Sequence, residues 1–378
     1  MLIFLAFASL SLGFPIDFEK IDSTVHENTS AHVSSPISVS EPLASKSQQF
    51  IGLEKDADKL QSAKVGKILQ NDCQIDVGAN EICTTVDAAL ATSCSESIYA
   101  IELKDQIHVE SLVVNKKSVI LIKGQDDNSQ PRTVWKASEQ AASLYTIQLQ
   151  QEIITLQYID FVYAMTTESN PVSTPTSSII YLHTLQEIYS EITIEHCNFI
   201  GLGNGLGSQQ TNSMLRSEGG QRVIVNDCSF SSANVVNSPI QATDYFQFSV
   251  SNCNFTDINS IGASGAIEIS GGRSDHFSIA IQSNIFDNCV GSLYGAISVI
   301  ASNQDTEESV SISFNQITNC TGSVTGGIYL EYDQFGTTDL GMNTFNGNIL
   351  SLTLQNDDQG QDAHIYKISR GYVGSDSI

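Results

Sequence analysis

Few residues in this chain combine the types and spacing that chemistry requires. Two carboxylate pairs, Asp126-Asp127 and Asp357-Asp358, could bind a cation, but each stands in a polar turn, where a solvated loop is the better interpretation. The seven histidines show no HExxH or similar ligand spacing, and His196 and His276 occupy positions typical of packing or surface residues. The glycine-rich segment 201–207 is not followed by the helix that a nucleotide loop requires. The sequence therefore predicts no catalytic residue, no metal site and no cofactor.

One set of side chains recurs at intervals that favour a binding surface. Each member follows, by one residue, an aliphatic residue of a repeated motif (SMLRS, SPIQA, GAIEI, GAISV, GGIYL). The set consists of Arg216, Gln241, Glu268, Ser298 and Tyr329. If the motifs stack, these side chains form one outward column that could hold an extended glycan through hydrogen bonds and a stacking ring. A solvated outer face that merely alternates with the core is the alternative.

Three Asn-X-Ser/Thr triplets are possible N-glycosylation acceptors, at Asn28, Asn254 and Asn319. Triplets of this kind also arise by chance, so they support the other features of the chain without deciding anything alone.

Internal repetition is the strongest pattern in the chain. Six segments (IEHCNF, VNDCSF, VSNCNF, IQSNIF, ISFNQI, LGMNTF) end on a large apolar residue, at intervals of 25 to 31 residues. These residues are Phe199, Phe230, Phe255, Phe286, Ile317 and Phe345. A second series keeps step with the first and contains Leu215, Ile240, Ile267, Ile297 and Ile328. Two motifs that share one variable period indicate a solenoid with one coil per repeat.

The repeats consist of short alternating segments separated by Gly, Ser and Asn, without a helix of useful length, which excludes ankyrin, tetratricopeptide and HEAT arrays. The sequence therefore predicts an all-β fold, a right-handed parallel β-helix of about ten coils. Stacked coils lie about 4.8 Å apart, so like residues form columns, and the two apolar series become inward ladders. Gly265, Gly295 and either Gly326 or Gly327 precede the second ladder, where we expect tight turns with positive φ.

The eight cysteines form two groups. Cys73, Cys83 and Cys94 lie close together where the fold begins, so we expect a local disulfide that leaves one thiol over. The other five recur at fixed places in the repeats, which favours small buried thiols stacked from coil to coil over disulfides. These five are Cys197, Cys228, Cys253, Cys289 and Cys320.

A short helix is expected just before the first strands. Thr84 and Asp87 match a capping box, and Val86, Ala89 and Leu90 share one helical face. Such a helix would cover the open edge of the first coil, which otherwise invites further strand pairing.

The apolar N-terminal run indicates the compartment, and the net charge disfavours some partners. The apolar run 1–14 predicts a signal peptide, 15–70 a flexible Ser-rich leader, and 71–378 the β-helix domain. Because 17 Lys and Arg face 42 Asp and Glu, the net charge of −25 disfavours nucleic-acid binding. No later segment reaches the length of a membrane span. We expect a secreted or cell-surface protein that does not span a membrane.

The repeats resemble those of known surface proteins. The GAI and GGI segments (265–267, 295–297, 326–328), paired with Phe-x-x-Asn-like segments (286–288, 345–348), are similar to repeats of chlamydial polymorphic outer membrane proteins. They also resemble right-handed β-helix surface proteins of pectin-lyase-like fold found in some protists. The chain carries no autotransporter barrel after its repeats, which favours a protist-type secreted form. The resemblance implies adhesion or surface display through the exposed faces of the helix.

Three functions remain open at this level. The first is non-enzymatic adhesion, display, or binding of an extracellular glycan or surface protein. The second is a polysaccharide-cleaving enzyme, a lyase or glycoside hydrolase, since many proteins of pectin-lyase-like fold act on polysaccharides. The Asn-Thr-Asp, Gly-His-Gly and Arg-Ile-Lys signatures of polygalacturonases are absent from the sequence, which favours the first function. The third is a coat component that assembles coil to coil.

Overall fold

The computed structural model describes residues 73–94, 98–115, 118–126, 131–136, 145–150, 153–162, 178–183, 190–201, 212–219, 221–245, 247–272, 278–301, 309–332, 337–350 and 365–369. All of them belong to one unit, Lys59–Ile378. The signal peptide, the leader, Asn28, Asp127, Asp357-Asp358, His276 and residues 202–207 of the glycine-rich segment lie outside the described residues and stay predictions.

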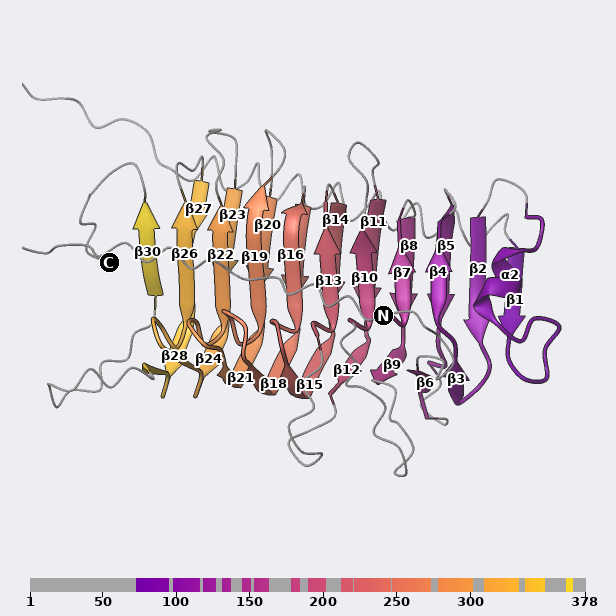
Figure 1. Ribbon diagram of the computed structural model, residues 1–378, viewed down its shortest axis with the longest axis horizontal. Helices are drawn as coiled ribbons and strands as arrows, with labels where there is room; N and C mark the ends of the chain where they lie inside the picture. The colour runs from indigo at the N-terminus through magenta and orange to yellow at the C-terminus, as the bar shows by residue number, and fades with distance from the viewer. Residues whose placement is uncertain are drawn as a thin grey trace, which may run out of the picture. The chain divides into compact units, whose positions relative to one another are not determined.

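The described chain forms three parallel sheets, which Figure 1 shows as successive coils along one axis. Sheet A contains β1 (Cys73–Val77), β2 (Ile98–Leu103), β5 (Val119–Lys123), β8 (Ile153–Gln157), β11 (Ser190–Glu195), β14 (Gln221–Asn226), β17 (Gln247–Ser251), β20 (Ser278–Gln282), β23 (Ser309–Ser313) and β27 (Thr337–Asp339). Sheet B contains β3 (Ile107–Val109), β6 (Thr133–Lys136), β9 (Ile159–Val162), β12 (Asn198–Ile200), β15 (Ser229–Val235), β18 (Asn254–Ser260), β21 (Ile285–Val290), β24 (Gln316–Thr318) and β28 (Thr344–Asn346), with the short β25 (Thr321–Gly322) and β29 (Ile349–Leu350) beside them. Sheet C contains β4 (Leu112–Val114), β7 (Ile147–Leu149), β10 (Ile180–His183), β13 (Leu215–Glu218), β16 (Ile240–Tyr245), β19 (Ile267–Gly272), β22 (Ile297–Ala301), β26 (Ile328–Tyr332) and β30 (Ile365–Ser369).

Each coil runs through sheets A, B and C in turn, and its strands pair in parallel with those of the next coil. This is the expected right-handed parallel β-helix, and the ten strands of sheet A confirm the predicted size of about ten coils. A crossover between neighbouring parallel strands is nearly always right-handed, so the hand follows from the L-residue twist of the strands.

The two predicted ladders form the core. Phe199, Phe230 and Phe255 pair in register across β12, β15 and β18, and their ring centroids lie 4.6 and 4.7 Å apart. The second ladder is continuous in register from Leu215 to Ile328 across sheet C. The sequence missed the upstream ends of both ladders, where the motifs are irregular: Trp135, Phe161, Leu112, Ile147 and Ile180 are also fully buried.

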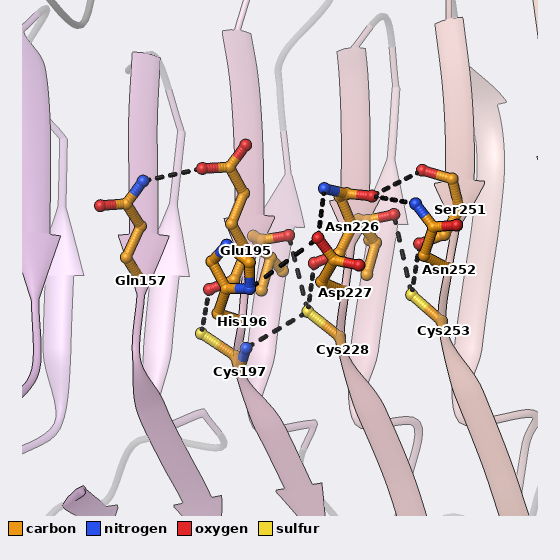
Figure 2. Close-up of polar contacts among 12 residues, drawn as sticks. Gln157, Glu195, His196, Cys197, Asn226, Asp227, Cys228, Ser251, Asn252 and Cys253 are labelled. Atoms are coloured by element: carbon orange, nitrogen blue, oxygen red, sulfur yellow. Dashed lines mark hydrogen bonds and ion pairs between the residues drawn. The ribbon is translucent and has the colours of Figure 1, made fainter. Parts of the chain in front are cut away.

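The cysteine column closes the sharp corner between sheets A and B (Figure 2). The residue at each corner is left-handed, with φ of 54° at His196, 51° at Asp227 and 55° at Asn252. The cysteine that follows is buried, and the Cys197 thiol donates to the Glu195 carbonyl at 3.3 Å. At this corner asparagines replace the cysteines from β20 onward: Asn284 Nδ2 donates to the Val250 carbonyl at 3.0 Å. Cys289, on β21, and Cys320, after β24, lie outside this corner. All five repeat cysteines are free and buried, as predicted.

The recurrent glycines meet a different requirement from the one expected. Gly265, Gly295 and Gly326 do not have positive φ; among the described residues the glycines that do are Gly219, Gly271 and Gly347. A Cβ on Gly265 would lie 2.0 Å from the Gly295 carbonyl oxygen, and one on Gly295 would lie 2.2 Å from that of Gly326. The prediction of positive φ is therefore wrong, and close approach of backbone between coils is the physical reason for glycine.

The helix α2 (Val86–Leu90) covers the first coils beside β1 and β2, as Figure 1 shows, with Val86, Ala89 and Leu90 buried as predicted. The predicted capping box of Thr84 and Asp87 is wrong, because Thr85 is the N-cap and accepts from the amide of Ala88, which has no side chain that could complete a box.

A buried carboxylate takes the place of the box. Glu110 accepts from the Val86 and Asp87 amides at 2.7 and 2.9 Å and pairs with His108 Nε2 at 2.8 Å. A Cys73–Cys94 disulfide closes this end and leaves Cys83 free, as expected.

Candidate binding face

The predicted outward column exists on sheet C. Arg216, Gln241, Glu268, Ser298 and Tyr329 are register partners on β13, β16, β19, β22 and β26. Their inward neighbours form the second ladder, so the alternation of the strand places the column on the outer face. The structure therefore brings all five side chains into one row.

Exposure divides this row into two parts. Arg216, Gln241 and Glu268 are half-buried, but Ser298 and Tyr329 are 0% and 5% exposed. Tyr329 stacks on Tyr294 with centroids 4.1 Å apart. Ser298 has a short side chain between two long ones, those of Glu268 and Tyr329 in the adjacent strands. The accessible part of the predicted face is thus the part on β13, β16 and β19.

A polar network that the sequence did not predict flanks this accessible part. Tyr181 on β10 precedes Arg216 in the same column and donates its hydroxyl to Glu218 Oε2 at 2.6 Å. Glu218 Oε1 accepts from Arg216 Nε at 2.8 Å, and His183 Nδ1 lies 3.5 Å from Oε2. The Tyr181 ring stacks on Tyr145 with centroids 4.2 Å apart. Five half-exposed side chains are therefore held in one geometry.

The protonation of this network is set by its contacts. Burial alone would raise the pKa of the Glu218 carboxyl, but the Tyr181 hydrogen bond and the Arg216 charge outweigh it and hold the pKa below its ordinary value. Burial, followed by the hydrogen bond to Glu218, raises the pKa of the Tyr181 phenol well above its ordinary value. Glu218 is consequently an anion and Tyr181 a neutral donor at neutral pH.

A second tyrosine pair repeats this arrangement nearer the C-terminal end. Tyr294 stacks on Tyr329, and the Tyr329 hydroxyl donates to Glu331 Oε2 at 2.7 Å. Tyr181 and Tyr329 are separated by five strand intervals on sheet C, about 24 Å at about 4.8 Å per interval. The accessible part of the row lies between the two pairs.

Unsatisfied polar atoms gather on the same sheet. Of eight buried side-chain polar atoms without a hydrogen-bond partner in the described part of the chain, five lie on sheet C or directly before its strands. They are Ser178 Oγ, His183 Nδ1, Ser213 Oγ, Gln241 Oε1 and Ser298 Oγ. Buried polar atoms in native proteins usually have a partner, and an unpaired group often indicates a water or a ligand.

The other candidate residues lie elsewhere. Asn254 and Asn319 are exposed on or beside sheet B, so both sequons are accessible. His196 stacks on Tyr158 and lies 3.8 Å from Asp227 at the corner between sheets A and B (Figure 2). Asp126 pairs with Lys123 at 3.3 Å. Among the described residues no group of His, Cys, Asp and Glu is arranged to hold a metal ion, and no helix is long and apolar enough to cross a membrane.

One signal in the sequence could have found Tyr181, His183 and Glu218. The segment 179–183 alternates apolar and polar residues as the later motifs do, but it lacks their GAI or GGI signature. Extending the column one coil upstream, and adding the next outward position, would have included all three residues.

Comparison with known proteins adds little to the geometry. No protein-family model matches the chain, and no curated protein matches it. One solved structure, that of a PL6 family alginate lyase, is similar with a TM-score of 0.35 and 12% identity. The match covers 79% of this chain and 39% of that chain, so the chain spans about two fifths of its length. A likeness of this size carries no functional argument; the fold of this chain is a right-handed parallel β-helix.

Proposed function

We propose that this chain is a non-enzymatic, secreted or cell-surface β-helix protein that binds an extracellular glycan or a surface protein through the outer face of sheet C. The observation that carries the proposal is the half-exposed row of Arg216, Gln241 and Glu268, in register on three adjacent strands. A rigid sheet fixes the spacing of such side chains, which is the preorganisation that recognition requires.

The chemistry of the flanking network supports binding over bond cleavage. A general base needs a pKa near the working pH and a free acceptor. The Tyr181 phenol has a raised pKa and already donates its proton to Glu218, while the lowered pKa of Glu218 makes it a weak base. A lyase or hydrolase remains the alternative function, and the test below measures cleavage as well as binding.

The resemblance to surface-protein repeats supports the same proposal. The segments that carry it, such as 265–267 and 295–297, build the turns before β19 and β22 and thereby position Glu268 and Ser298. Secretion follows from the interpretation of residues 1–14 as a signal peptide.

The test blocks the face without disturbing the core. Gln241→Asn creates an Asn-X-Thr acceptor with Thr243, so a eukaryotic secretory host would attach a glycan at the centre of the face. The full chain and this variant are incubated with polysaccharides and with intact cell surfaces, with and without calcium, and bound protein and new chain ends are quantified. The natural sequon at Asn254 on sheet B provides a glycosylated control position.

We expect retention without new chain ends, and loss of retention only in the glycosylated variant. Retention that survives a glycan at this position would refute the assignment of the face. New chain ends would refute the non-enzymatic function.

A further inference from the structure

The three half-exposed members of the row carry hydrogen-bonding groups that lack a full set of partners within the chain. Glu218 pairs with Nε and Nη2 of Arg216, and the guanidinium lies over the Tyr181 ring, 5.9 Å from its centroid. Nη1 makes no hydrogen bond with any of the described residues. Gln241 Oε1 also lacks a partner there, but this atom is buried, so a ligand reaches it only when the side chain turns outward. Glu268 Oε2 lies 3.1 Å from Ser238 Oγ, but the single proton of that hydroxyl also points at the Ser264 carbonyl at 2.7 Å. The row therefore offers one donor followed by two acceptors.

The spacing of these groups follows from the coil repeat. Arg216 pairs with Gln241, and Gln241 with Glu268, so the groups follow one another at about 4.8 Å along the helix axis. A ligand that satisfies all three must extend along the axis and must both accept and donate hydrogen bonds. A sugar hydroxyl does both, whereas a carboxylate only accepts and an ammonium only donates.

The charge of the face selects among hydroxylated ligands. The two outward columns from β10 to β26 hold one arginine, Arg216, against three glutamates, Glu218, Glu268 and Glu331, so carboxylates outnumber guanidinium groups by two. An acidic polysaccharide would be repelled by this face and by the net charge of −25.

The described face offers few of the anchors that a protein partner requires. Protein interfaces are centred on buried aromatic or aliphatic anchors. Among the outward positions of β13 to β22, Ile300 is apolar, Tyr245 at the end of β16 is aromatic and pairs with Gly272, and the others are Ser, Thr, Gln, Glu or Arg. The chemistry of the face therefore favours a hydroxyl-rich ligand over a second polypeptide.

Resting on the binding function proposed above, we propose that Arg216, Gln241 and Glu268 bind a neutral glycan chain that lies along the helix axis across β13, β16 and β19. Arg216 Nη1 donates to a ring or hydroxyl oxygen of one sugar. Glu268 Oε1 accepts from a hydroxyl group further along the chain, and Gln241 Oε1 accepts from another once its side chain turns outward. Glu218 is a positioning residue, because it fixes the guanidinium and leaves Nη1 free.

The test uses the full chain and three classes of soluble polysaccharide. Neutral glucan, mannan and xylan are compared with polygalacturonate and with chitosan by equilibrium binding. Gln241→Leu removes the amide at nearly constant volume, and Gln316→Leu makes the same change on the exposed outer face of sheet B as a control. Glu268→Gln keeps an acceptor but removes the charge. Circular dichroism and the urea midpoint establish that each variant is folded.

We expect the native chain and Gln316→Leu to bind a neutral glycan equally, and Gln241→Leu to bind it about tenfold more weakly. Glu268→Gln should retain neutral-glycan binding within about threefold and weaken any chitosan binding strongly. Binding that Gln241→Leu leaves unchanged refutes the site. Polygalacturonate or chitosan bound through these residues refutes the neutral ligand but leaves the binding function intact. If no polysaccharide binds, the inference is wrong, and the glycan-blocked variant on cell surfaces still tests the binding function separately.

Discussion

Replacement of Phe230 by alanine tests whether stacking between coils stabilises this β-helix. The ring is fully buried and lies between Phe199 and Phe255, with centroids 4.6 and 4.7 Å away and rings tilted by 3° and 4°. Loss of a buried phenylalanine costs about 3–5 kcal/mol when the cavity cannot collapse. Neighbouring rings held on two parallel strands cannot move far toward the gap, so we expect a loss of about 4 kcal/mol.

The control for this change is Phe345→Ala in the same column. Phe345 pairs with Ile317 and is only half-buried, so the transfer of less apolar surface predicts a loss of about 1–2 kcal/mol. Urea unfolding of both variants gives the midpoints. The dependence of the unfolding free energy on urea concentration must be the same for both variants, because a solenoid can unfold in parts and the midpoints would then not be comparable. If both changes cost the same, position within the stack does not determine stability, and the reasoning fails.

The remaining predictions concern the corner, the thiols, the acidic network and the helix cap. Cys253→Asn should keep the urea midpoint within the equivalent of about 1 kcal/mol, whereas Cys253→Asp should lower it clearly, since a carboxylate would be buried at the position that Asn284 occupies in the next coil. In the folded chain none of the five buried repeat cysteines should react with a thiol reagent, whereas in the unfolded chain all five should react in addition to Cys83; mass spectrometry counts the modified sites. Because folding lowers the pKa of Glu218, its contribution to stability is present above about pH 4 and is lost as the pH falls through the folded pKa. The difference in urea midpoint between the native chain and Glu218→Gln should therefore shrink from pH 6 to pH 3. Glu110→Ala should cost about 3 kcal/mol, because two buried amides of α2 lose their acceptor, and hydrogen exchange should rise in α2 before it rises in β17.

The fold could be predicted because repetition averages over local ambiguity. A single segment such as VNDCSF is compatible with several structures, but the same spacing at Phe230, Phe255 and Phe286 is compatible with few. The prediction weakened where the repeats become irregular, and Trp135 and Phe161 were missed although they extend the same ladder. The position of the N-cap was also wrong by one residue, because Glu110, distant in sequence, supplies the acceptors that a capping box would have supplied.

The site was predictable only as a column. Register follows from the repeat period, so the alignment of Arg216 with Gln241 and Glu268 was available from the sequence. The exposure of these side chains was not available from the sequence, since the burial of Tyr329 depends on its stacking with Tyr294 from the preceding turn region. The Tyr181–Glu218 hydrogen bond joins adjacent coils through outward side chains, whose conformations the period does not specify.

The corner between sheets A and B shows which property of the recurring cysteines the fold uses. Cys253 and Asn284 occupy the same place in successive coils, and each donates to a carbonyl of sheet A while the asparagine also accepts from the Cys253 amide at 2.8 Å. The shared requirement is a small buried donor beside a left-handed residue, not thiol chemistry. Burial raises the pKa of the Cys197 and Cys228 thiols at this corner, and of the Cys289 thiol on β21, so the reactive thiolate is scarce. The repeat cysteines are therefore protected from oxidation by the same packing that makes them replaceable by asparagine.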